Sequence, residues 1–186
     1  MPRLWFMLII VVSWSVQASD YVVDKQKSSI VFAGSYDGDV FEGQFTRWTM
    51  DIALSRNNIG GSHFSAIFYT RSAKTGRVLY NTTLPQKGWF YSQKYPKAVF
   101  NSTAVRALGP HSLTVIGDLM IRGRTQQVSF LVELDESSPD NNHDLVMKGT
   151  FDIDRLAYHI GREADEDAEW VSRKIAITFN VVMTKK

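Results

Sequence analysis

Residues 112–135 read SLTVIGDLMIRGRTQQVSFLVELD, and this stretch decides the fold. Apolar residues recur at every second position through 112–121 and again through 128–135, which is the period of a β-strand with one buried face. Gly123 lies between the two runs and is a turn signal. The stretch therefore predicts two neighbouring strands that place their apolar side chains on one face.

The same alternation continues outward over most of the chain. Further strands are expected at 28–36, 40–47, 48–54, 62–71, 97–105, 145–153 and 171–183. Turn signals rich in Gly, Asn, Asp and Pro separate these strands, at 37–39, 57–61, 109–110 and 137–142. No long segment has a helical period, and only 83–94 could form a short helix, beside one opening of the fold.

Eight or nine strands in one domain predict an all-β fold. An antiparallel sheet of that size must close or stack to protect its edges. Four glycines lie between large apolar residues on inward faces, at Gly34, Gly43, Gly117 and Gly149. They could let the strands coil, or they could leave room for a ligand, and both uses favour a single closed antiparallel barrel of about eight strands.

Length and composition limit the class of protein. A chain of 186 residues with 44% hydrophobic and 22% charged residues suits one globular domain. The net charge of +2 is too balanced for a protein that binds nucleic acid through its charge. The chain has no cysteine, which excludes disulfides, thiolate metal sites and cysteine nucleophiles.

Residues 1–18 resemble a secretory signal peptide. Arg3 provides the positive start, and an apolar run over 4–14 is too short to cross a bilayer comfortably. Ala18 offers a small residue for cleavage. We expect cleavage after Ala18, an exported protein, and one barrel domain over 19–186. The alternative is an uncleaved membrane anchor.

No pattern in the chain predicts catalysis or a metal site. Nucleophile-elbow, phosphate-loop and zinc-protease motifs are absent, and the four histidines are scattered, at His63, His111, His143 and His159. The acidic run over 163–169 lacks the alternation of a calcium loop. We therefore expect a protein that is not an enzyme and holds no cofactor.

The phenylalanines give the positive signal, because eight of the eleven fall on the inward faces of the strands. A barrel of this size either fills with side chains or encloses one ligand. The expected lining is Phe32, Phe45, Phe64, Phe68, Leu119, Phe130, Phe151 and Phe179, with Trp89 and Phe90 covering an opening. Arg155 and Tyr158 follow a strand and are the candidates for holding a polar head group.

Several stretches, in order along the chain, resemble the YceI-like family of exported polyisoprenoid-binding proteins. They are YVVD at 21–24 with SSIVF at 28–32, VFEGQF at 40–45, KYPKAVFNS at 94–102, VIGDLMIRG at 115–123 and FDIDR at 151–155. One segment departs from the family's pattern: LAYHIG at 156–161 stands where the family usually has an aromatic residue followed closely by Gly-Ile or Gly-Val.

The resemblance implies a lipocalin-like barrel in the bacterial periplasm that encloses a long-chain isoprenoid lipid and has no catalytic residues. It also allows a homodimer. A transient membrane contact is a separate expectation for a lipid carrier. The competing hypothesis is a periplasmic stress or interaction protein whose barrel is filled by its own side chains. A cavity in the interior separates the two hypotheses.

Overall fold

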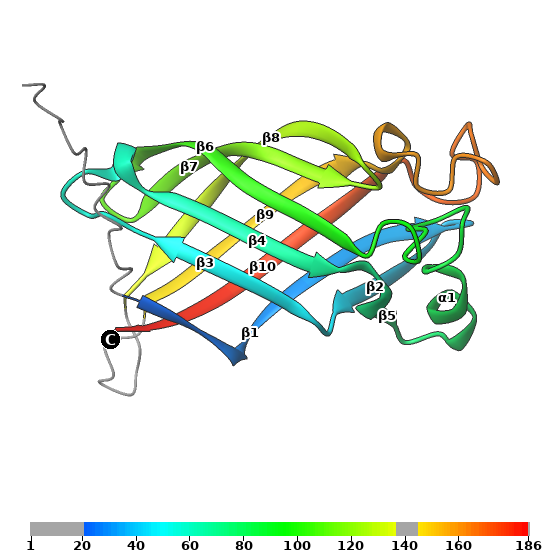
Figure 1. Cartoon of the computed structure of the whole chain (residues 1–186), viewed down its shortest axis with the longest axis horizontal. Coiled ribbons are helices and arrows are strands. Elements are labelled where there is room, and N and C mark those ends of the chain that lie inside the picture. Colours follow the sequence, from blue (N-terminus) through cyan, green and yellow to red (C-terminus); the bar gives the residue numbers. More distant parts are fainter. Residues whose placement is uncertain (1–20, 137–144, 186) are drawn as a thin grey trace, which may run out of the picture.

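The computed structural model describes residues 21–136 and 145–185. Strands dominate it (Figure 1). They are β1 (Tyr21–Tyr36), β2 (Asp39–Phe45), β3 (Trp48–Ala53), β4 (His63–Tyr69), β5 (Ala73–Thr75), β6 (Lys97–Gly109), β7 (Ser112–Ile121), β8 (Arg124–Asp135), β9 (Leu145–Asp154) and β10 (Lys174–Lys185). The signal peptide predicted at 1–18, its cleavage site, His143 and the turn predicted at 137–142 lie outside the described residues.

The strands expected from alternation all form. The alternation missed only β5, because a strand of three residues is too short to show a period. The short helix is not at 83–94. Helix α1 spans Val78–Thr83, and the segment from Leu84 to Tyr95 is a series of turns closed by local hydrogen bonds such as Tyr91 N–H to Gln86 O at 2.9 Å. In the described part of the chain, no helix has the length and apolarity needed to cross a membrane.

The strands form a single antiparallel sheet of ten strands, in the order β3-β4-β6-β7-β8-β9-β10-β1-β2-β5. The sheet curls into a half-barrel around an apolar core, with α1 at one end (Figure 1). The prediction of an all-β antiparallel fold is confirmed. The prediction of a closed barrel of about eight strands is not confirmed, because the sheet has ten strands and its two edge strands are β3 and β5.

The two ends of the sheet approach each other at one corner. β3 follows β2 after only two residues, so one stretch of chain belongs to both ends of the sheet. Two backbone hydrogen bonds cross the corner, from Thr46 N–H to Ser72 O at 3.1 Å and from Tyr69 N–H to Arg47 O at 3.0 Å. The corner thereby links β2–β3 to β4–β5 and draws the curled sheet around its interior.

Phenylalanine rings lie over the four glycines of the inward faces. Gly43 pairs with Phe32, and a Cβ built on Gly43 would lie 2.2 Å from the Phe32 ring. Gly149 pairs with Phe179 at a corresponding 2.5 Å. The rings of Phe41 and Phe100 likewise lie against Gly34 and Gly117. These glycines therefore accommodate neighbouring rings, as glycine and aromatic pairs do in curved sheets, and the hypothesis that they leave room for a ligand is wrong.

Candidate functional site

The interior of the curled sheet contains a cavity whose exposed wall is entirely apolar. Every strand except β5 contributes to the wall, and the turns after α1 add Leu84, Trp89 and Phe90. The empty volume is about 1300 Å³, including space where the cavity is open.

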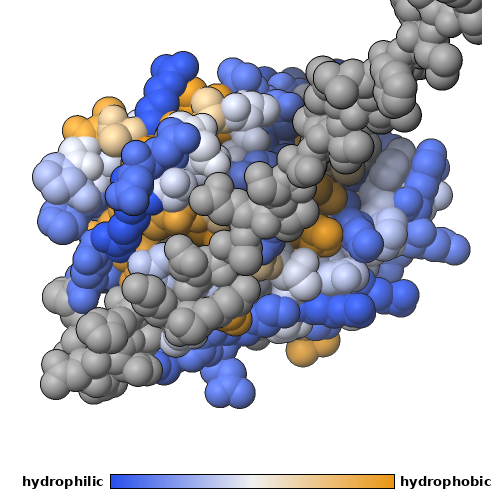
Figure 2. All heavy atoms as spheres, turned by 60° about the vertical axis from the view of Figure 1, so that its left-hand side comes forward, coloured by the Kyte–Doolittle hydropathy of each residue, from blue (hydrophilic) through white to orange (hydrophobic). Residues whose placement is uncertain are grey.

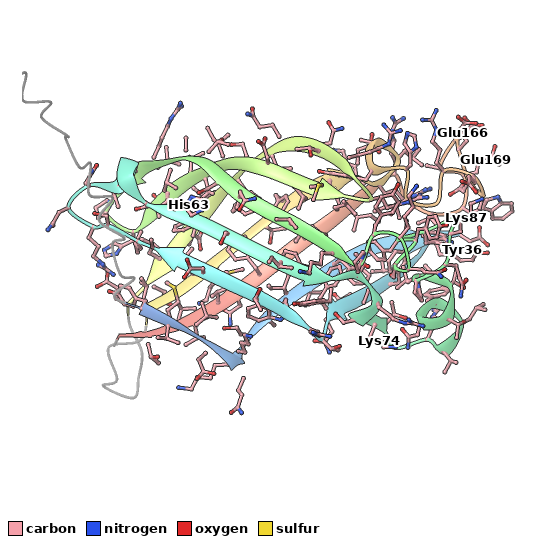
Figure 3. The ribbon with its side chains drawn as sticks, viewed as in Figure 1. Tyr36, His63, Lys74, Lys87, Glu166 and Glu169 are labelled. Carbon is pink, nitrogen blue, oxygen red and sulfur yellow. The ribbon has the colours of Figure 1, made fainter. Side chains whose placement is uncertain are left out.

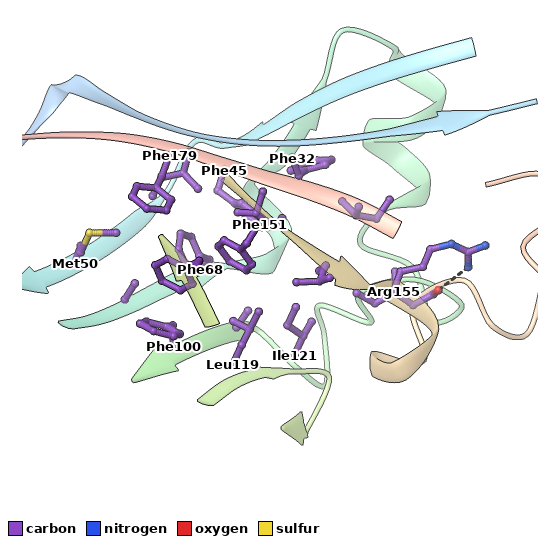
Figure 4. Close-up of a pocket in the computed structure, with 18 of the residues that line it drawn as sticks. Phe32, Phe45, Met50, Phe68, Phe100, Leu119, Ile121, Phe151, Arg155 and Phe179 are labelled. Atoms are coloured by element: carbon purple, nitrogen blue, oxygen red, sulfur yellow. Dashed lines mark hydrogen bonds between the residues drawn. The ribbon is translucent and has the colours of Figure 1, made fainter. Parts of the chain in front are cut away.

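Two groups of phenylalanines shape the wall (Figure 4). In the first, the Phe45 ring lies 5.5 Å from Phe32, 5.4 Å from Phe68 and 6.0 Å from Phe90, measured between centroids. In the second, Phe130 is central. Its ring stacks on Phe151 at 4.6 Å and lies 5.6 Å from both Phe100 and Phe179.

These contacts fix the side chains of the wall. Aromatic pairs at such distances contribute about 0.5–1.5 kcal/mol each beyond the burial of their surface. The rings are therefore held by one another, and the cavity between them does not need a ligand to keep its shape.

Eleven of the twelve residues predicted for the site line this cavity. They are Phe32, Phe45, Phe64, Phe68, Trp89, Phe90, Leu119, Phe130, Phe151, Phe179 and Arg155. Tyr158 does not line it. That these residues bind a ligand stays a prediction.

Sequence reasoning named the aromatic residues and passed over aliphatic ones on the same faces. Ile121, Ile153 and Ile175 occupy predicted inward positions and also line the cavity, so the alternation itself could have found them. Leu84 and Ile160 come from turns, where no period indicates which side chains point inward. Only the folded chain reveals their place.

Arg155 lies at one end of the cavity and is fully buried, with 0% of its surface exposed. Its Nη2 donates to Asp165 Oδ2 at 2.6 Å and to Val171 O at 2.8 Å. Its Nη1 donates to Ile160 O at 2.9 Å, and its Nε donates to Ser172 O at 3.1 Å. The guanidinium thus ties the end of β9 to the loop over 160–172.

The head-group role predicted for Arg155 is therefore wrong. Its guanidinium turns away from the phenylalanine rings (Figure 4), and its donors are used within the protein. A lipid phosphate would have to displace Asp165 from a buried ion pair, which is strongly unfavourable. Arg155 contributes only the aliphatic part of its side chain to the cavity wall.

The partner carboxylate is held in its charged form. Burial alone would raise the pKa of Asp165, but the N–H groups of Val171 and Trp170 and the charge of Arg155 outweigh burial and lower this pKa below its usual value. Burial lowers the pKa of Arg155, and the charge of Asp165 opposes that effect. We call Arg155, Asp165 and the backbone carbonyls that Arg155 binds the Arg155 cluster. This cluster stabilises the fold.

Tyr158 is also buried, with 1% of its surface exposed. Its hydroxyl has no hydrogen-bond partner among the described residues. Burial raises its pKa to about 12. Because Tyr158 packs into the core and not along the cavity, its predicted role at a head group is wrong as well.

The described residues bring together no three His, Asp or Glu side chains that could hold a metal ion. The wall of the cavity offers no polar atom to polarise a substrate or accept a proton. What the arrangement can do chemically is to exclude water from an apolar molecule.

Fold and cavity together define a class: β proteins that curl one antiparallel sheet around an apolar interior. The model of the YceI-like domain matches residues 21–183, and the chain belongs to this family. A UPF0312 protein of Vibrio vulnificus (strain YJ016) is 30% identical over 129 residues, 68% of each chain. The family expected from the sequence motifs is confirmed.

Solved structures of other proteins have the same fold as this chain. Burkholderia cenocepacia BcnA superposes with a TM-score of 0.80 at 24% identity, over 87% of this chain and 99% of that one. A polyisoprenoid binding domain from Saccharophagus degradans, implicated in plant cell wall breakdown, superposes with a TM-score of 0.67 at 14% identity, over 91% of this chain and 100% of that one. At these identities the likeness concerns the fold alone.

Proposed function

We propose that the protein binds a long-chain isoprenoid lipid, of the polyprenyl or quinone type, in the apolar cavity and carries or stores it without catalysing a reaction. The observation that carries this proposal is the cavity wall, which nine of the ten strands build and which exposes only apolar surface. Membership of the YceI-like family supports it, as does the isoprenoid binding named for the Saccharophagus neighbour.

The apolar wall provides the driving force for binding. Burying an apolar chain gains about 0.8 kcal/mol per CH₂ group. Ordering the chain offsets part of that gain. Because the wall offers no polar partner, the protein recognises the chain and leaves the head group outside the cavity. Selectivity for chain length is then modest, since one methylene is worth only about 1–3 kcal/mol.

The corner between β2 and β3 supports a wall that surrounds the lipid. Its two backbone hydrogen bonds link the ends of the sheet, and we infer that this corner closes the barrel around the bound chain. The cavity itself favours a lipid carrier over the competing interaction protein, whose interior would be filled with side chains.

Export to the bacterial periplasm completes the proposal. The signal peptide predicted at 1–18, with cleavage after Ala18, would place a lipid carrier between two membranes. N-terminal sequencing of protein recovered from the periplasm of its host should begin at Ser19. A homodimer, which the family resemblance allows, is measured on the same material by light scattering.

The direct test extracts lipid from protein purified from its native host and identifies the lipid by mass spectrometry. We expect an isoprenoid lipid in stoichiometric amount. Native protein that yields no apolar lipid would contradict the proposal.

A second test narrows the cavity. Ile177 lines the cavity from β10, and the next residue, Thr178, lies exposed on the opposite face of the same strand. Ile177→Trp should lower the uptake of an isoprenoid chain from detergent solution by about tenfold or more, because the larger ring occupies space that the chain needs. Thr178→Trp is the matched control and should leave uptake unchanged. Equal uptake by both variants would remove the cavity as the binding site.

A further inference from the structure

Charge is distributed unevenly along this nearly neutral chain. Residues 71–97, which we call the basic lip, contain no Asp or Glu and six cations, Arg71, Lys74, Arg77, Lys87, Lys94 and Lys97. All six are exposed, and within the described residues none of them pairs with a carboxylate. The basic lip comprises β5, α1 and the turns that lead to β6.

The basic lip also carries apolar side chains, and these face in two directions. Leu84, Trp89 and Phe90 point into the cavity and are part of its wall. Val78 and Leu79, on α1, point outward and are 79% and 70% exposed. The cavity explains the inner side, whereas nothing within the described residues covers the outer side.

More exposed apolar side chains gather beside α1. The Tyr36 ring lies 6.1 Å from the Tyr80 ring of α1. Asp37, next to Tyr36, donates from its N–H to Trp170 O at 2.8 Å. We call the resulting patch the apolar rim; it consists of the exposed residues Tyr36, Val40, Val78, Leu79 and Trp170.

The basic lip and the apolar rim lie at the same end of the molecule. Figure 3 shows Tyr36, Lys74 and Lys87 there, on the side of α1. The opposite end, turned forward in Figure 2, shows hydrophilic and hydrophobic residues side by side where it is not covered by grey atoms. The end with α1 also carries carboxylates, among them Glu166 and Glu169 (Figure 3). Exposed apolar residues next to a run of cations are typical of a surface that contacts an anionic bilayer.

We propose that the basic lip and the apolar rim dock the protein on an anionic lipid bilayer. Val78 and Leu79 enter the interface, and the surrounding lysines and arginines attract the phosphate groups. Docking brings the segment that lines the cavity through Trp89 and Phe90 against the lipid, where an apolar chain can pass without crossing water. The acidic loop beside Trp170 carries Glu163, Glu166, Asp167 and Glu169. The part of the apolar rim that enters the bilayer is therefore Val78 and Leu79, on the side of β5 and α1, and Trp170 lies at its margin.

The test uses residues 19–186, the protein expected after cleavage of the predicted signal peptide, which contain the whole family domain. Binding is measured by flotation with vesicles of phosphatidylcholine alone and of phosphatidylcholine mixed with phosphatidylglycerol. We expect binding to the anionic vesicles, weaker binding to the neutral ones, and loss of the difference in high salt, which screens exposed charges. No binding to anionic vesicles would overturn the proposal.

Two variants separate the apolar and the charged contributions. The double variant Val78→Ser/Leu79→Ser should weaken binding to anionic vesicles by about tenfold or more, since two apolar side chains no longer enter the interface. Lys74→Gln should weaken it by about fivefold, the effect of one cation near a charged surface. Unchanged binding by both variants would contradict the proposed face.

The matched control is Leu108→Ser. Leu108 is exposed on β6, roughly 35 Å along the strand from Lys97 at a rise of about 3.3 Å per residue. It should bind vesicles as the unaltered protein does, and an equal loss would show that any exposed apolar residue suffices, which overturns the proposal. An oligomer that Val78→Ser/Leu79→Ser dissociates, with no vesicle binding, would instead assign this face to a second copy of the chain.

Docking depends on the surface residues of the basic lip and the apolar rim, and vesicle binding is measured on protein that has no isoprenoid lipid added. The uptake of an isoprenoid chain from detergent is measured without vesicles. Failure of one proposal therefore leaves the other intact.

Discussion

The residues of the cavity wall and Arg155 were predicted from the sequence as two parts of one ligand site, and they differ in how their contacts are satisfied. The phenylalanines of the wall contact one another and still leave empty volume beside them. The guanidinium of Arg155 is enclosed by one carboxylate and several backbone carbonyls. An apolar face can therefore bind a ligand, whereas a buried guanidinium whose three nitrogens all donate within the protein stabilises the fold.

This contrast follows from the cost of burial. An apolar side chain that faces a cavity loses van der Waals contacts, but it leaves no hydrogen bond unmade. A charged side chain leaves water only when its partners are supplied by the protein itself. The four predictions below test this contrast, from the largest expected effect to the smallest.

The largest effect is expected from Arg155→Met. The substitution leaves Asp165 buried without its partner and frees the carbonyls of Ile160 and Val171. We expect the free energy of unfolding in urea to fall by about 3–5 kcal/mol. The matched control is Arg162→Met, which removes an exposed ion pair with Glu166 and should change stability by less than about 0.5 kcal/mol. A fully stable Arg155→Met protein would return the guanidinium to the candidates for ligand binding.

Gly149→Ala tests the wall. The added Cβ would lie 2.5 Å from Leu131 O and 2.5 Å from the Phe179 ring. We expect a loss of about 1–3 kcal/mol, because the ring must leave its rotamer or the strands must shift. Gly76→Ala is the control, since a Cβ at Gly76 meets nothing within 4 Å. If both variants have the same free energy of unfolding, Gly149 is not needed to accommodate the Phe179 ring.

The pH dependence of unfolding tests the charge on Asp165. Its pKa in the folded state is below its usual value, so the folded state holds its proton less tightly than the unfolded state. This contribution to stability is complete above about pH 4 and is lost as the pH falls through the folded pKa. Asp165→Asn removes it, and the difference in stability between the two proteins should narrow in acid. A difference that stays constant down to pH 2 would contradict a charged Asp165.

The smallest effect at neutral pH is expected from Tyr158→Phe. Its buried hydroxyl has no partner among the described residues, so removing it should change stability by less than about 1 kcal/mol. Above pH 10 the two proteins should diverge. The pKa of Tyr158 is raised to about 12, and the unfolded chain releases that proton earlier. The unaltered protein then loses stability as the pH rises from 10 to 12, and the variant lacks this loss. A large loss at neutral pH would reveal a hydrogen bond to the hydroxyl.

Much of the fold could be predicted because a β-strand with one buried face has a period of two. The alternation in 112–121 and 145–153 correctly assigned Leu119 and Phe151 to the interior. It could not show that the inward glycines accommodate rings, because that contact joins residues of neighbouring strands. It missed β5 and misplaced α1, because segments of three and six residues lack a period.

By itself, the sequence determined the family, the all-β class and the faces that the phenylalanines share, since these follow from local order along the chain. Only the tertiary structure decided that empty volume lies between the rings and that Arg155 is fully paired. It also gathered Val78, Leu79, Tyr36 and Trp170 on one rim. Each of these features depends on residues that are distant in sequence, and the curvature of the sheet, which no local pattern specifies, sets the distances between them.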